Sequence, residues 1–486
     1  MTRGVSGQED HLDVLIVGAG ISGVDAAYHL QTRCPDKSYA ILEARGRIGG
    51  TWDLFRYPGV RSDSDIYTLG FPFRPWRGDK SIVGGAEIRA YVEETAREFG
   101  IDRRIRFGHR VTRAAWCSRE ARWRVEAETE EGPRRFSCVF VFLASGYYDY
   151  GRGYRPQWQG EADFKGRIVH PQFWPEALDY RGKHVVVIGS GATAVTLVPA
   201  LAEQAAHVTM LQRSPSYIAS RPSRDALARP LGPALTRLKN VLLGIWFFSL
   251  ARRRPAKVRA KLLDLVRGEL PRGYDVERHF GPRYNPWDQR LCLVPDGDLF
   301  AQIRDGRVAI ATGEIETFTP GGIRLTSGEE IAADIVVAAT GLVVKLLGGI
   351  ALEVDGEPAK PAERLVYKGM MLSDVPNHAL AFGYTNASWT LKCDLTARYV
   401  CRLLRHMDRQ GWDVCVPRLP ANGVERQPML DFSSGYVARA EPFLPKQGAQ
   451  APWRVHQNYL KDLGALRFGG IVDGTMEFRR SSPPPA

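Results

Sequence analysis

The stretch that decides the fold is Asp13-Val14-Leu15-Ile16-Val17-Gly18-Ala19-Gly20-Ile21-Ser22-Gly23. A short apolar run typical of a buried strand leads into the pattern G-x-G-x-x-G, and a helix is expected over Val24–Leu30. In this context Gly18 permits a tight turn, Gly20 lets the backbone approach a pyrophosphate, and Gly23 lets helix and strand pack closely. Free N–H groups at the helix N-terminus favour phosphate. The stretch therefore predicts a Rossmann-like unit that binds a dinucleotide.

An acidic residue follows at the distance where the ribose of such a nucleotide would lie. A second strand is expected over Tyr39–Leu42, and Glu43 comes directly after it, 20 residues beyond Gly23. A carboxylate at that point can accept hydrogen bonds from ribose hydroxyls. We therefore predict that Glu43 holds the ribose, since a chance glycine cluster would not carry strand, helix and acid in this order.

The pattern returns about 170 residues later, as His184–Ile188 followed by Gly189-Ser190-Gly191-Ala192-Thr193-Ala194. The next expected strand, Val208–Leu211, ends in Gln212-Arg213-Ser214 instead of an acid. An arginine can donate two hydrogen bonds to a 2′-phosphate, which a carboxylate would repel. We therefore predict an NADPH site that uses Gly189, Gly191, Ala192, Thr193, Arg213 and Ser214. The alternative for Arg213 is a solvated surface arginine.

Composition limits the other classes. The chain has 486 residues, of which 44% are hydrophobic and 25% charged, as expected for a globular protein of two or three domains. Its seven cysteines are scattered and never spaced C-x-x-C, which argues against disulfides, a metal site and a dithiol centre. The net charge of +12 fits an enzyme with polyanionic ligands, and no nucleic-acid motif accompanies it. A cytoplasmic enzyme is expected, because no secretory signal opens the chain.

Two longer patterns carry a resemblance to a known family. Residues 49–63 fit [A/G]-G-x-W-x-x-x-x-[F/Y]-P-[G/M]-x-x-x-D, and residues 164–175 fit F-x-G-x-x-x-H-x-x-x-W-P. The first resembles the class B flavoprotein monooxygenases, and the second resembles the type I Baeyer–Villiger monooxygenases among them. The run from Gly50 to Gly59 looks like that of the small Baeyer–Villiger enzymes that also oxygenate sulfur in thioamides. The resemblance extends from Val14 to about Asp394.

The resemblance implies two cofactors and their contacts. FAD would occupy the first site, which comprises Gly18, Gly20, Gly23, Glu43, Gly50, Thr51, Trp52, Asp53, Tyr57 and Asp63. NADPH would occupy the second, and the turn Ala339-Thr340-Gly341 is similar to those where such chains cross between nucleotide domains. In the linker, Gly166 would shape the backbone while Phe164 and Trp174 pack it down. His170 is expected to orient this hinge by donating to backbone rather than to act as a general base.

The resemblance also implies a catalytic pair. A flavin C(4a)-peroxide must stay anionic to attack a carbonyl, which requires a fixed positive charge and exclusion of water. Arg290 best matches the family's essential arginine, and Asp63 matches the acid that pairs with it. The alternatives are a surface salt bridge for Arg290 and a helix cap for Asp63. Trp389 and Thr390 would lie near the flavin ring or pack in the core.

The predicted fold is α/β, with two dinucleotide-binding Rossmann-like domains and a helical insert. We assign residues 1–149 and 375–486 to the FAD domain, 150–219 and 290–374 to the NADPH domain, and 220–289 to the insert. Within the insert, the apolar residues 241–250 lie between cations, so residues 237–254 form either an interfacial membrane helix or a wall of the substrate channel. Ten apolar residues are too few to span a bilayer. The tail over 479–486 is expected to lack regular structure.

The expected activity is that of an NADPH- and O2-dependent monooxygenase that converts apolar ketones to esters or lactones. Oxygenation of sulfides or thioamides would be a second activity. One alternative is a flavin monooxygenase that oxygenates nitrogen or sulfur only, although its linker pattern ends differently from Trp174-Pro175. The other is a non-catalytic redox sensor that binds NADPH and FAD.

Overall fold

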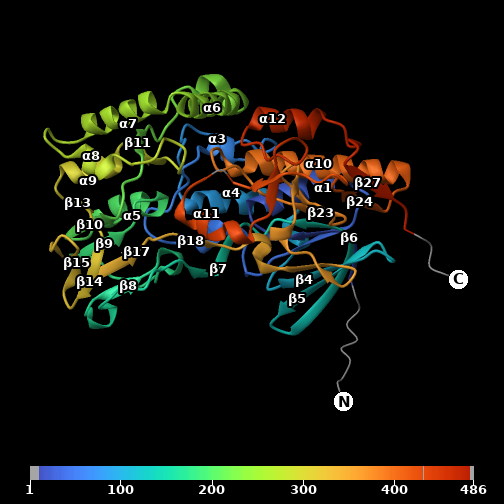
Figure 1. Ribbon diagram of the computed structural model, residues 1–486, viewed down its shortest axis with the longest axis horizontal. Coiled ribbons are helices and arrows are strands. Elements are labelled where there is room, and N and C mark those ends of the chain that lie inside the picture. Colours follow the sequence, from blue (N-terminus) through green and yellow to red (C-terminus); the bar gives the residue numbers. More distant parts are fainter. Residues whose placement is uncertain (1–9, 431, 482–486) are drawn as a thin grey trace, which may run out of the picture.

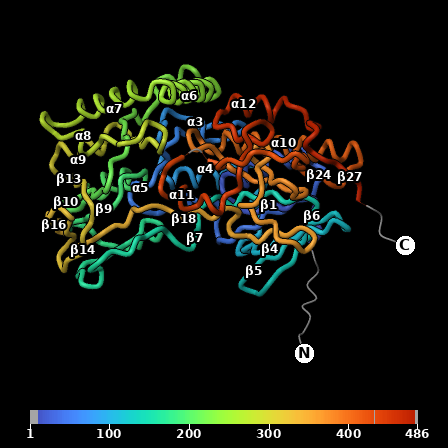
Figure 2. Tube along the Cα trace, viewed as in Figure 1, coloured from blue at the N-terminus to red at the C-terminus, as the bar shows by residue number. Residues whose placement is uncertain are grey.

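The computed structural model describes residues 10–430 and 432–481, so the tail from 482 onward lies outside the described residues. Two α/β units stand side by side, and helices α6 and α7 lie along the top of the molecule (Figure 1). The tube in Figure 2 shows the red C-terminal segment lying beside the blue N-terminal segment, so the first unit is built from both ends of the chain.

The first unit is organised around a mixed sheet in the order β20-β19-β4-β5-β6-β1-β2-β3, with β23 also paired to β6. Strands β1, β2, β3 and β6 run parallel, which places the ends of β1 and β2 at the first glycine loop. The strands are β1 (Asp10–Val17), β2 (Tyr39–Leu42), β3 (Ile105–Arg106), β4 (Arg110–Cys117), β5 (Arg122–Thr129), β6 (Gly132–Leu143), β19 (Ala351–Val354), β20 (Glu357–Pro358) and β23 (His378–Leu380).

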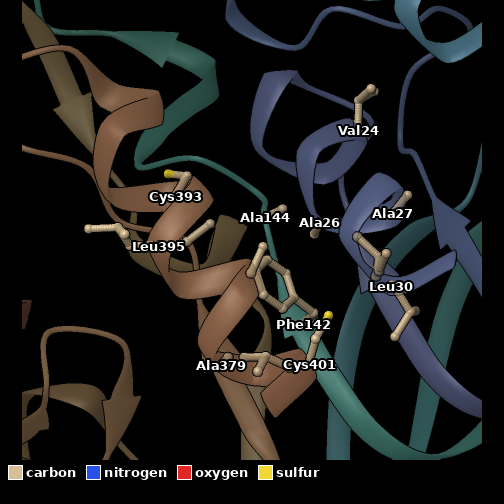
Figure 3. Packing of buried hydrophobic residues seen from close by; sticks show 14 of the residues in the cluster. Val24, Ala26, Ala27, Leu30, Phe142, Ala144, Ala379, Cys393, Leu395 and Cys401 are labelled. Carbon is tan, nitrogen blue, oxygen red and sulfur yellow. The ribbon is translucent and has the colours of Figure 1, made fainter. Parts of the chain in front are cut away.

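Both faces of this sheet are buried. Because successive residues of a strand point to opposite faces, each strand contributes to two cores. Val14 and Ile16 of β1 face a core formed with α1 (Ile21–Arg33), α4 (Gly85–Glu98) and α10 (Trp389–Gln410). Figure 3 shows this packing, with Leu30 of α1, Phe142 of β6 and Cys401 of α10 close together. Leu15 and Val17 face the opposite core. The first glycine loop therefore follows a strand of a sheet that is packed against a core on each face.

The second unit contains a parallel sheet in the order β13-β10-β9-β17-β8, with α5 packed against it. A three-stranded antiparallel sheet, β14-β15-β16, covers another part of this unit. The elements are β8 (Arg167–Val169), β9 (His184–Ile188), α5 (Ala192–Ala202), β10 (His207–Gln212), α9 (Asp298–Arg304), β13 (Val308–Thr312), β14 (Ile315–Thr319), β15 (Gly322–Leu325), β16 (Glu330–Ala332) and β17 (Ile335–Ala338).

Between β10 and α9 the chain makes a long excursion. It begins with β11 (Ile218–Arg221), continues through α6 (Ala228–Arg253), α7 (Pro255–Glu269) and α8 (Val276–Phe280), and returns in β12 (Cys292–Pro295). Strands β11 and β12 pair in parallel, with Ile218 opposite Cys292 and Arg221 opposite Pro295. The excursion therefore leaves one end of this two-stranded ribbon and returns at the other.

Short elements complete the fold. Strands β7 (Tyr148–Gly153) and β18 (Leu342–Val344) pair between the two units. The others are α2 (Thr51–Leu54), α3 (Ile66–Leu69), β21 (Val366–Tyr367), β22 (Met371–Leu372), β24 (Val414–Pro417), β25 (Arg426–Pro428), α11 (Gly435–Ala440), β26 (Lys446–Gly448), α12 (Tyr459–Leu463) and β27 (Met476–Arg479).

Three boundaries differ from those expected from sequence. Residues 290–374 were assigned to the second unit, but β19 pairs with β4 of the first sheet, so the chain returns there near residue 351 rather than 375. The helical insert was expected from residue 220, whereas Ser220 and Arg221 still belong to β11. Arg479 ends β27 instead of opening an irregular tail. In each case pairing with a distant strand, which no local pattern reports, sets the limit.

Candidate functional site

The first glycine loop has the geometry of a phosphate cradle. Gly18 adopts a φ of +105°, and Gly20 is the N-cap of α1, where no side chain caps the helix. A methyl group at Gly50 would lie 3.2 Å from the Cα of Gly20, so two bare backbones face each other here. A methyl group at Gly23 would lie 1.9 Å from the carbonyl oxygen of Gly18, which leaves no room for a side chain. The uncapped helix start suits a pyrophosphate.

Glu43 follows β2 beside this cradle. Its side chain is buried and accepts hydrogen bonds from the backbone N–H groups of Ala19, at 2.7 Å, and of Arg45, at 2.8 Å. Burial raises the pKa of Glu43, while the two N–H donors and Arg45 favour its charged form. The loop therefore holds the carboxylate where the first nucleotide's ribose was expected.

Asp53 is held by three arginines. Its buried carboxylate binds Arg45 at 2.6 Å, Arg56 at 3.2 Å and Arg89 at 3.4 Å. Burial opposes the charged form, but these guanidinium groups prevail and lower the pKa of Asp53. These ion pairs fix the loop around α2, beside the expected first nucleotide site. In α2, Thr51 lies 3.3 Å from the hydroxyl of Tyr150.

Trp52 and Tyr57 take structural positions around the same loop. Trp52 is half-buried and packs against the core of the first unit. Tyr57 is buried within the core of the second unit, next to α5. Burial raises the pKa of Tyr57 to about 12, and Thr193 at the start of α5 hydrogen-bonds its hydroxyl. Tyr57 thus links the two expected nucleotide sites.

The second glycine loop repeats the geometry of the first. Gly189 has a φ of +138°, and Gly191 is the N-cap of α5, where no side chain caps the helix. A methyl group at Gly191 would meet no atom within 4 Å. Arg213 and Ser214 are exposed just beyond β10. Gln212 is buried and donates to the carbonyl of His279 and to the hydroxyl of Thr312. Ala192 and Thr193 form the first turn of α5.

The linker pattern lies where the two units meet. Phe164 packs in the core beside Phe318, and Trp174 packs against the second unit. A methyl group at Gly166 would lie 2.3 Å from the carbonyl oxygen of Asp334, which explains the glycine. Thr340 donates to the carbonyl of Tyr154 at 2.7 Å, and Gly341 has a φ of +113°.

His170 contacts the backbone on both sides of its ring. Its Nδ1 atom accepts the backbone N–H of Gln172 at 3.2 Å, and burial lowers the pKa of His170 although hydrogen bonds with the backbone of Gly341 and Tyr154 oppose this shift. A methyl group at Gly153 would lie 2.0 Å from the His170 ring, so the ring packs directly on the β7 backbone. His170 therefore contacts the backbone of segments on either side of it, as the expected hinge-orienting role requires.

Arg290 and Asp63 meet although 227 residues separate them. Two hydrogen bonds join them, from Nε to Oδ2 at 2.6 Å and from Nη2 to Oδ1 at 2.7 Å. This is the bidentate geometry of a strong charge-assisted pair. Desolvation opposes the charge on the guanidinium, but Asp63 outweighs it and raises the pKa of Arg290. Asp65, not Asp63, caps α3 through the N–H of Thr68.

Aromatic side chains surround Arg290, and the sequence did not single them out. The nearest phenol groups are those of Tyr147, Tyr148 and Tyr436, whose pKa values are raised by burial. Tyr147 stacks on Trp389 with ring centroids 4.9 Å apart, and the indole N–H of Trp389 donates to Ser22. Tyr147 and Tyr148 directly follow Gly146, and this position after a strand and turn is the sequence feature that could have indicated them.

Two cavities meet at Arg290. A narrow one is lined by Tyr147, Arg290, Tyr384, Trp389 and Tyr436. The larger one measures about 380 Å³, within the range of small-molecule sites, and Arg290 and Asp63 form part of its wall. Trp287 also lines it, with a φ of +73° that is rare for a bulky residue and typical of functional strain.

Helix α6 separates this larger cavity from solvent. Val241, Ile245 and Phe248 line the cavity, whereas Leu235, Leu238, Leu242 and Trp246 form an exposed stripe at helical spacing. Arg237 was expected to flank a membrane-facing segment, but it donates to the carbonyls of Tyr67, Thr68 and Gly70. Lys239 likewise pairs with Asp225. By length and composition alone, α6 is long and apolar enough to cross a membrane.

A buried ionic cluster lies between α1 and α10, away from both cavities. The ligand-type atoms of Asp25, His29 and Asp394 lie within 4.8 Å of one another. Arg398 pairs with Asp394 at 2.8 Å, and Arg33 donates to His29 at 3.2 Å. These arginines supply the positive charge that the carboxylates require, so the cluster forms an ion-pair network that joins the two helices.

Fold and site together define a flavoprotein monooxygenase class with two nucleotide-binding units. The model for the family described as pyridine nucleotide-disulphide oxidoreductase matches residues 15–233. "FAD-containing monooxygenase EthA" of Mycobacterium tuberculosis is 54% identical and covers 98% of this chain and 99% of its own. "Probable FAD-binding monooxygenase AlmA" of an Acinetobacter species is 47% identical, with 97% of each chain covered. The chain therefore belongs to the family of FAD-containing monooxygenases that includes EthA.

Solved structures share the fold. "Oxidized steroid monooxygenase bound to NADP" has a TM-score of 0.74 at 22% identity, with 97% of this chain and 100% of the other covered. A cyclohexanone monooxygenase with bound epsilon-caprolactone has the same TM-score at 18% identity, with the same coverage. At these identities the similarity establishes the α/β architecture alone.

Proposed function

We propose that this protein is an NADPH- and O2-dependent FAD monooxygenase that converts apolar ketones to esters or lactones. The balance is one ketone, O2, NADPH and a proton to one ester, NADP+ and water. The observation that carries the proposal is the bidentate Arg290–Asp63 pair in the wall of an otherwise largely apolar cavity. Family membership supports the coarser part, a flavin-dependent monooxygenase.

The residues present fit both cofactors. FAD would lie with its pyrophosphate at Gly20 and Gly50, and with its ribose at Glu43. NADPH would lie with its pyrophosphate at Gly191 and its 2′-phosphate at Arg213 and Ser214, which are exposed and free to donate. When bound, the flavin supplies the chemistry that takes hydride from NADPH and activates dioxygen.

Arg290 would stabilise the negative charge that develops on oxygen during transfer. A guanidinium cannot lose its proton at working pH, and it can donate two hydrogen bonds at once. Asp63 orients it by holding Nε and Nη2, which leaves Nη1 free to donate toward substrate. Trp287 and the stacked Tyr147–Trp389 pair would keep water away, because exclusion of water strengthens the charge–charge interactions inside.

The cavity favours an apolar substrate. Its wall is formed largely by side chains such as Val241, Phe247, Phe248 and Leu391. A sulfide or thioamide of similar shape would fit the same wall and accept the same oxygen atom, so sulfur oxygenation is the second activity we propose. We also propose a cytoplasmic enzyme that touches membranes through the exposed stripe of α6.

The experiment is a product analysis with purified, FAD-loaded protein on a panel of apolar ketones and sulfides. Arg290→Ala should lower ester formation at least 100-fold, and Arg290→Lys should recover little because lysine cannot donate in the same geometry. Arg283→Ala, which removes an exposed arginine from the same loop region, is the matched control and should keep full activity.

Three outcomes would contradict the proposal. Ester formation that survives in Arg290→Ala would move the catalytic role to another residue. Oxidation of sulfides and amines without any ester from any ketone would favour the nitrogen- and sulfur-oxygenating alternative. Flavin-loaded protein that binds NADPH but consumes no oxygen with any substrate would favour a redox sensor.

A further inference from the structure

The larger cavity contains one charge without a partner among the described residues. Four charged side chains line it. Asp63 and Arg290 neutralise each other, and Asp65 accepts from the N–H of Thr68 and from Asn240. Arg221 is half-buried, and the structure gives its guanidinium neither a hydrogen bond nor an ion pair within residues 10–430 and 432–481. Two acids and two arginines make the lining neutral overall, and Arg221 is the charged side chain in it that no described residue holds.

The nearest acidic group on the same segment does not satisfy Arg221. The charge of Arg221 contributes to the lowered pKa of Asp225, but the two groups form no ion pair. The carboxylate of Asp225 instead binds Lys239 at 2.5 Å and the backbone N–H of Leu227. An arginine at a cavity wall presents a planar fork that matches a carboxylate or phosphate. Arg221 is thus positioned to bind an anion that enters the cavity.

Arg221 and Arg290 lie at opposite ends of the β11–β12 ribbon. Arg221 lies opposite Pro295 in the ribbon, and Arg290 precedes Pro295 by five residues in the chain. The two arginines are therefore about five extended residues apart along the ribbon. At about 3.3 Å per residue, this is roughly 16 Å between backbones. Leu291 and Leu293 line the cavity between them, and Val241, Phe247 and Phe248 of α6 cover it. The space between the two cations is therefore apolar.

From this arrangement we propose that the cavity selects amphipathic substrates with a carbonyl at one end and a carboxylate at the other. Arg221 binds the carboxylate, α6 and the ribbon cover the aliphatic body, and the carbonyl lies at Arg290. Medium-chain oxo acids are the substrate class. This inference rests on the proposed function and adds Arg221 as the residue that determines specificity.

The first test measures binding without turnover. Isothermal titration of the FAD-loaded protein with dodecanoate and with methyl dodecanoate compares two ligands that differ only in the terminal charge. Dodecanoate should bind at least tenfold more tightly, as expected for a desolvated charge-assisted hydrogen bond. Arg221→Gln should remove this difference and Arg221→Lys should restore part of it. Arg253→Gln, an exposed arginine of α6 outside the cavity, should behave like wild type.

The second test measures KM and kcat for the derivative of dodecanoate that carries a methyl ketone at its far end, and for its methyl ester. Wild type should show a KM for the acid at least tenfold below that for the ester. In Arg221→Gln the KM of the acid should rise to that of the ester, while its kcat stays within about twofold.

The outcomes separate this inference from the proposed function. Equal binding of dodecanoate and its methyl ester by wild type overturns the anion site. A rise in the KM of NADPH in Arg221→Gln, with the preference for acid retained, assigns Arg221 to the cofactor and overturns the inference. Tight, Arg221-dependent binding of dodecanoate without conversion of any ketone would uphold the anion site while the proposed activity fails.

Discussion

At the scale of single residues, a substitution at Gly191 tests cofactor binding without disturbing the packing of the protein. A methyl group there meets no protein atom within 4 Å, and its φ of −82° suits any residue. We therefore expect Gly191→Ala to fold with an unchanged melting temperature but to raise the KM of NADPH at least tenfold, because the methyl group occupies the space of the pyrophosphate. Gly268→Ala in the exposed part of α7 is the control and should keep the KM. An unchanged KM in Gly191→Ala would place the phosphates elsewhere.

His378 gives the protein a defined acid sensitivity. It is fully buried, its Nε2 atom accepts the N–H of Leu372 at 2.7 Å, and burial lowers its pKa to about 3. The unfolded chain binds a proton near pH 6.5, so the contribution of His378 to stability is present above pH 6.5 and is lost as pH falls toward 3. At pH 5 the loss from this group is about 2 kcal/mol.

We expect His378→Gln, which keeps an acceptor but cannot be protonated, to flatten the dependence of melting temperature on pH between about 7.5 and 5. The measurement is differential scanning calorimetry on FAD-loaded protein. His184→Gln, a change at an exposed histidine, is the control and should show the slope of wild type. Identical slopes for all three proteins would mean that His378 is protonated in the folded state without cost.

Residue types with a fixed local pattern could be predicted, and residues joined only by tertiary structure could not. The glycines at 18, 20 and 23 stand in a continuous pattern, and their geometry follows from three neighbouring elements. Arg290 and Asp63 were paired through the resemblance to a family, not through spacing. Tyr436 and Arg221 reach the cavities from distant segments without a motif, so no signal in the sequence placed them there.

At the scale of elements, α6 has two apolar faces with different environments. Leu238, Leu242 and Trp246 are at least 46% exposed, and Arg253 and Arg254 near the helix end face solvent. An apolar stripe next to free cations is typical of helices that lie on anionic membranes. We expect the protein to co-sediment with phosphatidylglycerol vesicles much more than with phosphatidylcholine vesicles.

The matched variants for this helix are a double change, Leu242→Ser with Trp246→Ser, and a control, Leu460→Ser, an equally exposed leucine of α12. The double change should lower vesicle binding at least tenfold, since each buried apolar side chain contributes about 1.5 kcal/mol or more. If wild type instead forms a dimer that the double change dissociates, the stripe binds a second copy of this chain and not a membrane.

The pattern of α6 predicted a helix but not the use of its cations. Apolar residues occur on both sides of this helix, so sequence alone left a membrane face and a channel wall as alternatives. In the structure the helix has both: one face lines the cavity and the other is exposed. Arg237 could not be placed in advance, because the carbonyls that it binds belong to α3, about 170 residues earlier.

At the scale of the whole molecule, an ion pair connects the two nucleotide units. Arg61 of the first unit binds Asp298 of α9 at 2.6 Å, with side chains only 15% and 30% exposed. Such a pair contributes about 1 kcal/mol at most. Loss of the pair should let the units separate more often, so we expect Asp298→Asn to increase substrate-independent NADPH oxidation by up to about fivefold.

The control is Asp264→Asn, which removes a fully intrahelical pair with Arg267 in α7. Oxygen consumption and NADPH oxidation, measured together without substrate, give the uncoupled rate. A rate that rises equally in both variants would reflect general destabilisation rather than weakened contact between the units.

The two-unit architecture could be predicted because each unit contains a strand, a glycine loop and a helix in direct succession. The point of return to the first sheet could not, since β19 is only four residues long and pairs with β4, more than 200 residues earlier. The formation of such short strands depends on packing against distant partners, which the local sequence does not indicate.

The excursion from β11 to β12 has a consequence for how this family can diversify. The residues that shape the cavity roof lie between two strands that pair with each other in parallel, so the segment 222–289 leaves one end of this ribbon and returns at the other. Homologous recombination of that segment between relatives should exchange substrate preference as a module and leave both glycine cradles intact. A chimaera that inherits chain-length preference from the donor of the segment, and cofactor affinity from the recipient, would show this modularity.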